Sequence, residues 1–168
     1  MEMPDYSGFV AALADRNGQP ESAFAALEAL TKEIVGVKLF TIMTSDTTEK
    51  VSERIYSNMP EAYPVSGTKP YNETYWSDIA LKQRRTFVAN TIEDIAGVFD
   101  DHELIASLGC QSVINVPIVI AGEVVGTINC LHEAGFYTKE RVEAAEALKL
   151  PAAACMLLHE KLKNGSGK

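Results

Sequence analysis

The chain has 168 residues, of which 46% are apolar and 23% are charged. This balance is typical of one globular domain with a buried core, and it excludes disordered, collagen-like and coiled-coil chains. The 15 Lys and Arg residues are outnumbered by 23 Asp and Glu, and the net charge of −8 repels polyphosphate, so we expect no nucleic-acid partner.

The first third of the chain predicts one helix and one hairpin. Residues 1–20 have a mixed pattern that ends in the break DRNGQP, so we interpret them as an N-terminal extension. Over residues 22–35, apolar side chains recur every three or four positions, which predicts an amphipathic helix. Segments 38–44 and 53–57 are rich in β-branched and aromatic residues, and they predict two antiparallel strands.

A long loop and several short elements are predicted next. Residues 58–72 contain three prolines and Gly67, which disfavour helix and strand interiors, so we expect a loop that serves as a lid or binding segment. A short helix is expected from residue 73 or 74 to Gln83, followed by a strand at 86–89. Residues 91–99 are expected to be irregular, and a helix is predicted from residue 100 to residue 109.

The clearest pattern in the chain is a second hairpin. Residues 112–120 and 123–131 are largely apolar runs on either side of Ala121-Gly122, which predicts two strands joined by a two-residue turn. Gly126 inside the second run indicates that another segment approaches its backbone closely.

Two asparagines, Asn115 and Asn129, interrupt the apolar runs of this hairpin. A buried amide needs hydrogen-bond partners, and solvent at an edge strand or a neighbouring helix could supply them. A two-residue turn places Asn115 opposite Ile128, so the two amides should point to opposite faces of the sheet. In that register only one of them can line a pocket.

A last long helix is predicted to begin near Thr138, with Pro151 as the expected site of a kink. Residues 163–168 are expected to form a flexible tail, which leaves residues 21–162 as the folded domain. The order of elements predicts an α+β fold with an antiparallel sheet, because hairpins exclude an all-parallel sheet.

No apolar run reaches the ~20 residues that a membrane span needs, and the N-terminus lacks the basic start and apolar stretch of a signal peptide. We therefore expect a cytoplasmic protein with no membrane contact. Cys110, Cys130 and Cys155 form no CxxC pair and stand among apolar neighbours, which is typical of reduced, buried thiols. The cysteines and histidines show no metal-ligand spacing, so no metal site is predicted.

The second hairpin and the segments around it resemble the GAF domain, a small-molecule-sensing fold found in many signalling proteins. The resemblance covers residues 22–158 and is most specific in LGCQSVINVPIVIAGEVVGTINCLH, residues 108–132. The family's ordered Leu-Gly, Ser, Val-Pro and hairpin glycines stand here as Leu108, Gly109, Ser112, Val116, Pro117, Gly122 and Gly126.

This resemblance implies a central antiparallel sheet with the terminal helices on one face. The other face should carry a pocket, roofed by the loops and short helices of residues 58–108. In such proteins the terminal helices commonly build a dimer, so the resemblance also implies a homodimer.

The predicted ligand-binding residues are Tyr71, Tyr75, Trp76, Asp78, Asn115 and Asn129. The first four lie in the expected roof, where aromatic rings can wall an apolar pocket and a carboxylate can take a cation or a donor. The alternative is that Tyr75 and Trp76 only anchor a loop to the sheet.

A small enzyme that acts on a metabolite is the alternative function, with four candidates for acid, base or nucleophile: Asp78, His102, Cys110 and His132. The GAF-fold free methionine-R-sulfoxide reductases use thiols in the lid and several residues ahead of the hairpin serine. Here the lid segment 76–85 has no cysteine, and Cys110 stands only two residues before Ser112. That activity is therefore not expected.

We expect instead a sensory or regulatory domain that binds a small molecule, stands alone as a homodimer and signals through a partner protein. No cofactor is predicted, because the motif of the cyclic-nucleotide-binding members is absent and Cys110 lacks the adjacent histidine of bilin-binding members. The basic cluster Lys82, Arg84 and Arg85 is interpreted as the end of a surface helix or as an anion clamp. A scaffold whose pocket has closed is a third class, and it would bind no ligand.

Overall fold

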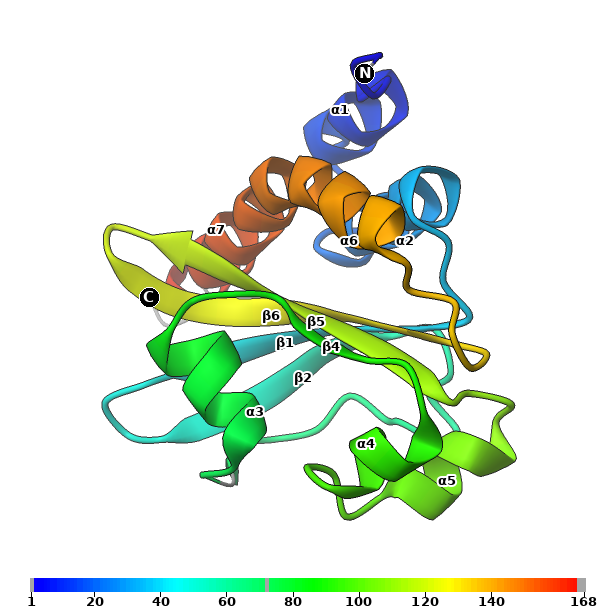
Figure 1. The fold of residues 1–168 in the computed structure, drawn as a ribbon. Coiled ribbons are helices and arrows are strands. Elements are labelled where there is room, and N and C mark those ends of the chain that lie inside the picture. Colours follow the sequence, from blue (N-terminus) through cyan, green and yellow to red (C-terminus); the bar gives the residue numbers. More distant parts are fainter. Residues whose placement is uncertain (1, 72, 166–168) are drawn as a thin grey trace.

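The computed structural model describes residues 2–71 and 73–165, and a six-stranded antiparallel sheet forms its centre (Figure 1). The strand order is β3-β2-β1-β6-β5-β4. The strands are β1 (Leu39–Asp46), β2 (Val51–Ser57), β3 (Lys69–Pro70), β4 (Phe87–Ala89), β5 (Ser112–Ile120) and β6 (Glu123–His132). Neighbouring strands pair in antiparallel fashion throughout, which confirms the predicted α+β fold and both predicted hairpins.

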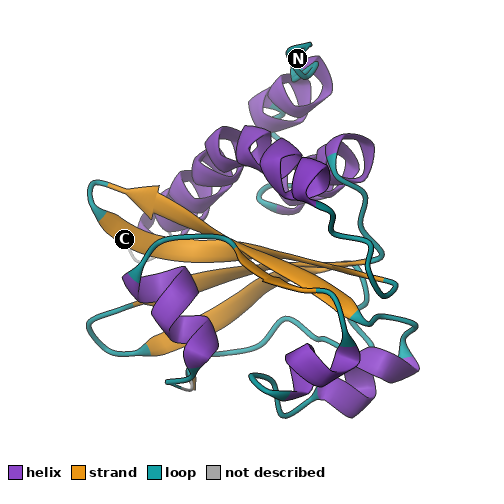
Figure 2. Cartoon of the chain, viewed as in Figure 1, coloured by secondary structure: helices purple, strands orange, loops and turns teal. Residues whose placement is uncertain are grey.

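Helices cover the sheet on both faces (Figures 1 and 2). The terminal helices lie on one face: α1 (Ser7–Ala14), α2 (Glu21–Ile34), α6 (Lys139–Ala144), the 3-10 turn η2 (Ala145–Leu148) and α7 (Lys149–Gly165). The short elements lie on the other: α3 (Tyr75–Ser77), the π-helical turn η1 (Asp78–Lys82), α4 (Ile92–Ala96) and α5 (His102–Ser107). This is the layered arrangement that the family resemblance implies.

Side-chain alternation along the central strands builds two separate cores. Ile114 and Ile128 point toward the terminal helices and join the larger core. Val113 and Leu131, one and three positions away on the same two strands, point to the opposite face and join a smaller core under α4 and α5. The central strands are therefore apolar on both faces, which explains why their sequences read as continuous apolar runs.

Four segments differ from the prediction. The predicted loop of residues 58–72 contains the short strand β3, which pairs with β2. Residues 1–20 contain a helix, α1, whose Phe9 is buried in the larger core, so this part packs on the domain. Residues 91–99 contain α4, which begins where the Thr91 side chain accepts a hydrogen bond from the backbone N–H of Asp94. The predicted tail begins as helix, because α7 continues to Gly165. Asn72 and residues 166–168, the ends of the predicted loop and tail, lie outside the described residues.

The last helical segment is irregular, but not at the predicted proline. The irregular part is η2, which separates α6 from α7. Pro151 follows in the first turn of α7, where the missing N–H interrupts no intrahelical hydrogen bond.

The described helices are all too short or too polar to span a bilayer. The cytoplasmic location stays a prediction. Cys110, Cys130 and Cys155 are buried and form no disulfide, as their apolar neighbours indicate. Burial raises the pKa of all three thiols, which makes them poor nucleophiles at neutral pH.

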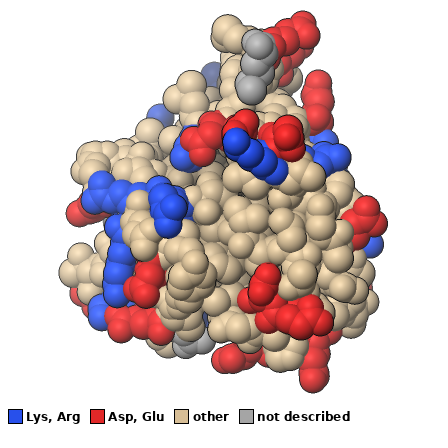
Figure 3. All heavy atoms as spheres, in the orientation of Figure 1, with Lys and Arg blue, Asp and Glu red and all other residues tan. Residues whose placement is uncertain are grey.

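Charged side chains are spread unevenly over the face seen in Figure 3. Basic side chains gather at the left, over η1, and acidic side chains are concentrated at the lower right, over α4 and α5. Lys82 of the predicted basic cluster is paired with Asp78 at 2.9 Å, which is the surface-helix arrangement rather than an anion clamp.

Candidate functional site

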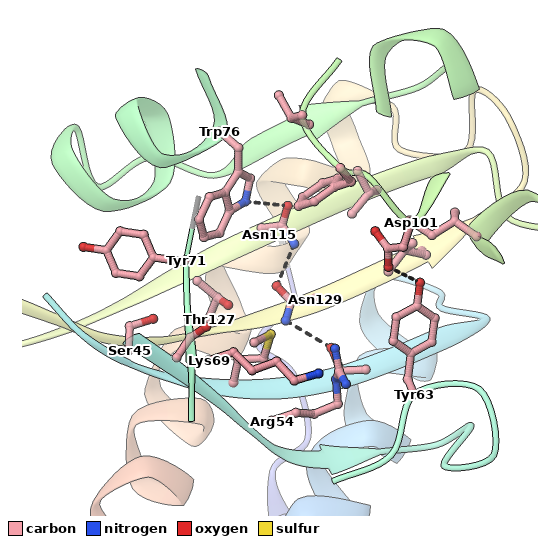
Figure 4. Close-up of a pocket in the computed structure, with 18 of the residues that line it drawn as sticks. Ser45, Arg54, Tyr63, Lys69, Tyr71, Trp76, Asp101, Asn115, Thr127 and Asn129 are labelled. Carbon is pink, nitrogen blue, oxygen red and sulfur yellow. Dashed lines mark hydrogen bonds between the residues drawn. The ribbon is translucent and has the colours of Figure 1, made fainter. Parts of the chain in front are cut away.

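A cavity of about 270 Å³ lies on the sheet face opposite the terminal helices, between the central strands and the roof of short elements (Figure 4). Its apolar walls are formed by Leu39, Met43, Pro70, Tyr71, Trp76, Val98, Phe99, Ile105, Val113 and Leu131. Its neutral polar groups come from Thr41, Ser45, Ser52, Tyr63, Thr74, Asn115, Thr127 and Asn129. Its charged residues are Arg54, Lys69 and Asp101.

Both predicted amides line this cavity, so the prediction that they face opposite sides is wrong. The turn residues have positive φ angles, 50° at Ala121 and 82° at Gly122, as the predicted two-residue turn requires. The pairing then shifts by one residue between Ile118 and Val119, at a β-bulge. Beyond this bulge Asn115 lies opposite Asn129, and a one-residue shift brings both to the same face.

A chain of hydrogen bonds crosses the cavity floor from the roof to β1 (Figure 4). Trp76 Nε1 donates to Asn115 Oδ1 at 3.0 Å, and Asn115 Nδ2 donates to Asn129 Oδ1 at 2.6 Å. Asn129 Nδ2 then donates to Thr41 Oγ1 at 3.1 Å. Each carboxamide has a second N–H, which makes no hydrogen bond to the described protein residues and is available to a ligand.

The amide pair should contribute to stability as a unit. Replacing either Asn115 or Asn129 by leucine should lower the free energy of unfolding by about 1–3 kcal/mol, because the remaining amide loses a buried partner. The double variant should lose less than the sum of the two, because that unpaired partner is gone. Urea unfolding of all three gives the coupling energy.

The exposed Asn17 provides a matched control, and Asn17→Leu should change stability by less than about 0.5 kcal/mol. Strictly additive effects of Asn115→Leu and Asn129→Leu would contradict the hydrogen-bonded pair.

Trp76 both walls the cavity and anchors the roof to the sheet, the two roles that the sequence offers as alternatives. Its ring lines the cavity and packs near Phe99, with ring centroids 6.1 Å apart, while its N–H anchors the roof to the floor. The backbone N–H of Thr74 is bound by the Ser77 hydroxyl, in a capping box that fixes the start of α3. Tyr71 lines the cavity beside Trp76 (Figure 4).

Two predicted roof residues lie outside the cavity. The Tyr75 side chain is 68% exposed and packs on the edge of Phe87. Asp78 is an exposed partner of Lys82 on the surface of η1. Of the four predicted roof residues, therefore, only Tyr71 and Trp76 face the cavity. The other two point outward from the α3–η1 turn.

The charged end of the cavity was not predicted from the sequence. Arg54 of β2 lies over the ring of Tyr63, with the guanidinium carbon 4.9 Å from the ring centroid. The Tyr63 hydroxyl in turn donates to the carboxylate of Asp101 (Figure 4). Burial, together with this hydrogen bond, raises the pKa of Tyr63 far above its usual range, so the phenol stays protonated. The one sequence signal is the position of Arg54, a charged residue inside the predicted strand of residues 53–57.

None of the four catalytic candidates lines the cavity. Asp78 is at the surface, Cys110 is buried in the smaller core, and the ring of His102 lies 3.2 Å from the Phe99 carbonyl at the start of α5. His132 stacks on Phe136 at 3.6 Å, and partial burial lowers its pKa. Among residues 2–71 and 73–165, no His, Cys, Asp and Glu side chains gather in a group that could hold a metal ion.

The strand order, with terminal helices on one face of the sheet and a roofed cavity on the other, defines the class of fold. The sequence model of the GAF domain matches residues 23–155, and the chain belongs to the GAF domain family. This confirms the resemblance that the second hairpin carries. No curated protein is similar to the chain at a significant level.

Solved structures, including GAF domains, share the fold. The GAF domain of a two-component sensor histidine kinase from Bacillus halodurans has a TM-score of 0.64 at 16% identity, covering 88% of this chain and 98% of that one. The GAF domain of a phosphoenolpyruvate-protein phosphotransferase from Coxiella burnetii has a TM-score of 0.68 at 13% identity, covering 94% and 92%. The chromophore-binding domain of a bacteriophytochrome from R. palustris has a TM-score of 0.59 at 15% identity, covering 94% and 60%.

Proposed function

We propose that this chain is a sensory or regulatory domain whose cavity binds a small molecule. The observation that carries the proposal is the cavity of about 270 Å³, with apolar walls and a few convergent polar groups. Small-molecule sites commonly have this composition. An apolar cavity of about 150 Å³ is enough to hold benzene, so this space has room for a ligand with at least one ring.

The roof provides a route from binding to output. Trp76 joins the α3 segment to the floor through one hydrogen bond to Asn115, so a ligand that contacts either residue alters how the roof is held. The similar domain from Bacillus halodurans belongs to a two-component sensor histidine kinase, and the one from R. palustris is the chromophore-binding domain of a bacteriophytochrome. We propose that this chain passes its signal to a partner protein in the same way.

Native mass spectrometry of the protein purified from the organism that encodes it tests the binding function. We expect a non-covalent adduct of small-molecule mass on the folded protein, and its loss on denaturation. A protein that carries no adduct, even after incubation with the small-molecule fraction of the same cells, would contradict the proposal.

We also propose that the domain forms a homodimer through its terminal helices. Leu150 and Leu157, one heptad apart on α7, are 77% and 57% exposed, and Val10 of α1 is 58% exposed. Large apolar side chains on one helix layer are typical of a protein interface.

The variant Leu150→Glu/Leu157→Glu should convert a dimer to a monomer, because it places charges in the proposed interface. The control Leu104→Glu makes the same change at an exposed leucine of α5, on the other face of the sheet, and should leave the dimer intact. Light scattering coupled to size-exclusion chromatography gives the mass. A monomeric wild-type protein at high concentration, or a dimeric double variant, would contradict this interface.

A further inference from the structure

One end of the cavity carries two cationic side chains, Arg54 and Lys69, that form no ion pair with a described carboxylate. Arg54 donates from Nη1 to the Pro64 carbonyl at 3.1 Å, and its buried Nε finds no hydrogen-bond partner among the described residues. No ion pair within the described part of the chain includes Arg54 or Lys69. A buried donor without a partner costs free energy unless a bound group satisfies it.

The two cations belong to one face of the β2–β3 ladder. Lys69 lies directly opposite Ser52, and Arg54 is two residues further along β2 on the same side. Diagonal neighbours at this spacing are within reach of long side chains, and both residues line the cavity. Figure 4 shows the two side chains extending into it.

The third charged residue, Asp101, attracts Arg54 electrostatically but forms no ion pair with it. Its carboxylate accepts the Tyr63 hydroxyl instead. The net charge of the three charged lining residues, Arg54, Lys69 and Asp101, is therefore +1, whereas the net charge of the whole chain is −8. Burial lowers the pKa of Arg54, but a guanidinium remains charged at physiological pH.

We propose that the ligand of this cavity is a small carboxylic acid with an apolar, ring-sized body, and that Arg54 and Lys69 bind its carboxylate. This inference rests on the proposed function of the cavity. The Arg54 fork offers the planar geometry that a carboxylate matches. Trp76 and Phe99 enclose the apolar body, and the free N–H groups of the floor amides bind its polar substituents. A phosphate monoester dianion fits less well, because the lining supplies a single net positive charge.

The requirement for a carboxylate can be tested with three pairs of probes, each a carboxylate and the neutral amide of the same molecule. They are acetate and acetamide, phenylacetate and phenylacetamide, and indole-3-acetate and indole-3-acetamide, with phenyl phosphate as the phosphate arm. Ligand-observed NMR measures binding of every probe, including weak ones. We expect phenylacetate or indole-3-acetate to bind about tenfold or more tightly than its amide, and phenylacetate to bind more tightly than phenyl phosphate.

Variants of Arg54 and Lys69 show which side chain causes the preference for acids over amides. Arg54→Met should reduce the acid-to-amide ratio to about one while amide binding persists, which shows that the cavity is still formed. Arg54→Lys should retain part of the ratio, because it keeps the charge and loses the fork. Lys69→Met should reduce it by a smaller factor, and the exposed Lys139→Met on α6 should leave it unchanged.

The outcomes separate this inference from the function on which it rests. Amides that bind as well as acids, a preference that survives Arg54→Met, or tighter binding of phenyl phosphate would each overturn the carboxylate assignment and leave small-molecule binding standing. Binding of none of the seven probes would contradict both.

Discussion

Replacing Gly126 by alanine should lower the free energy of unfolding by at least about 3 kcal/mol, the largest stability effect expected of a single methyl group in this chain. A Cβ atom at this position would overlap the Met43 carbonyl oxygen of β1 and lie 2.7 Å from Cε of Met156. The methionine can move, but the carbonyl belongs to the β1–β6 ladder, where Gly126 pairs with Thr44. Relief therefore requires the central strands to separate.

Two further variants distinguish the backbone clash from other causes. Gly8→Ala in α1 meets no atom within 4 Å and should leave stability unchanged or slightly higher. Adding Met156→Ala to Gly126→Ala removes the side-chain clash only, so it should not restore stability. Urea unfolding measures all of them, and a loss below about 1 kcal/mol for Gly126→Ala would contradict the close approach of β1.

Replacing Thr127 by phenylalanine should abolish ligand binding and leave the fold intact. Thr127 projects from β6 into the cavity and is 2% exposed, so a phenyl ring at this position fills the ligand's space (Figure 4). We expect affinity to fall by at least about 100-fold, because the ring must be expelled before a ligand can enter. The apolar area that the ring buries offsets its packing strain, so stability should change by no more than about 1 kcal/mol.

Thr48→Phe is the matched control, because it introduces the same ring on the exposed β1–β2 turn. It should retain the wild-type affinity for the molecule that native mass spectrometry finds, or for phenylacetate. If Thr127→Phe is folded and binds as tightly as the wild type, the ligand does not occupy this cavity.

The sequence predicts the fold well because its strongest patterns are local. The helix α2 is recognised from its apolar periodicity over 14 residues, and the strands β5 and β6 from two apolar runs on either side of one turn. The short helices are harder to predict. The helix α1 has only eight residues, and its pattern does not distinguish a loose extension from a segment that buries Phe9.

The site was predicted only in part, because its key feature is a shift in register. Asn115 and Asn129 stand out in the sequence as polar residues within apolar runs, but an ideal hairpin sends them to opposite faces. The bulge beside Val119 changes this. Its one sequence signal is Gly126, which adjoins the bulge, but a glycine inside a strand indicates a close backbone approach equally well. Arg54 meets Tyr63 and Asp101 only through tertiary structure, so sequence spacing could not bring them together.

The indole N–H signal of Trp76 tests the central claim most directly. Trp76 is the single tryptophan of the chain, and its ring lines the cavity, so this signal reports on the cavity alone. In a titration of ¹⁵N-labelled protein with the small-molecule fraction of its own cells, we predict a saturable shift of this signal and of the Asn115 and Asn129 side-chain amides. The same titration should leave them fixed in Thr127→Phe. Wild-type signals that stay fixed throughout would contradict a ligand-binding cavity at this face of the sheet.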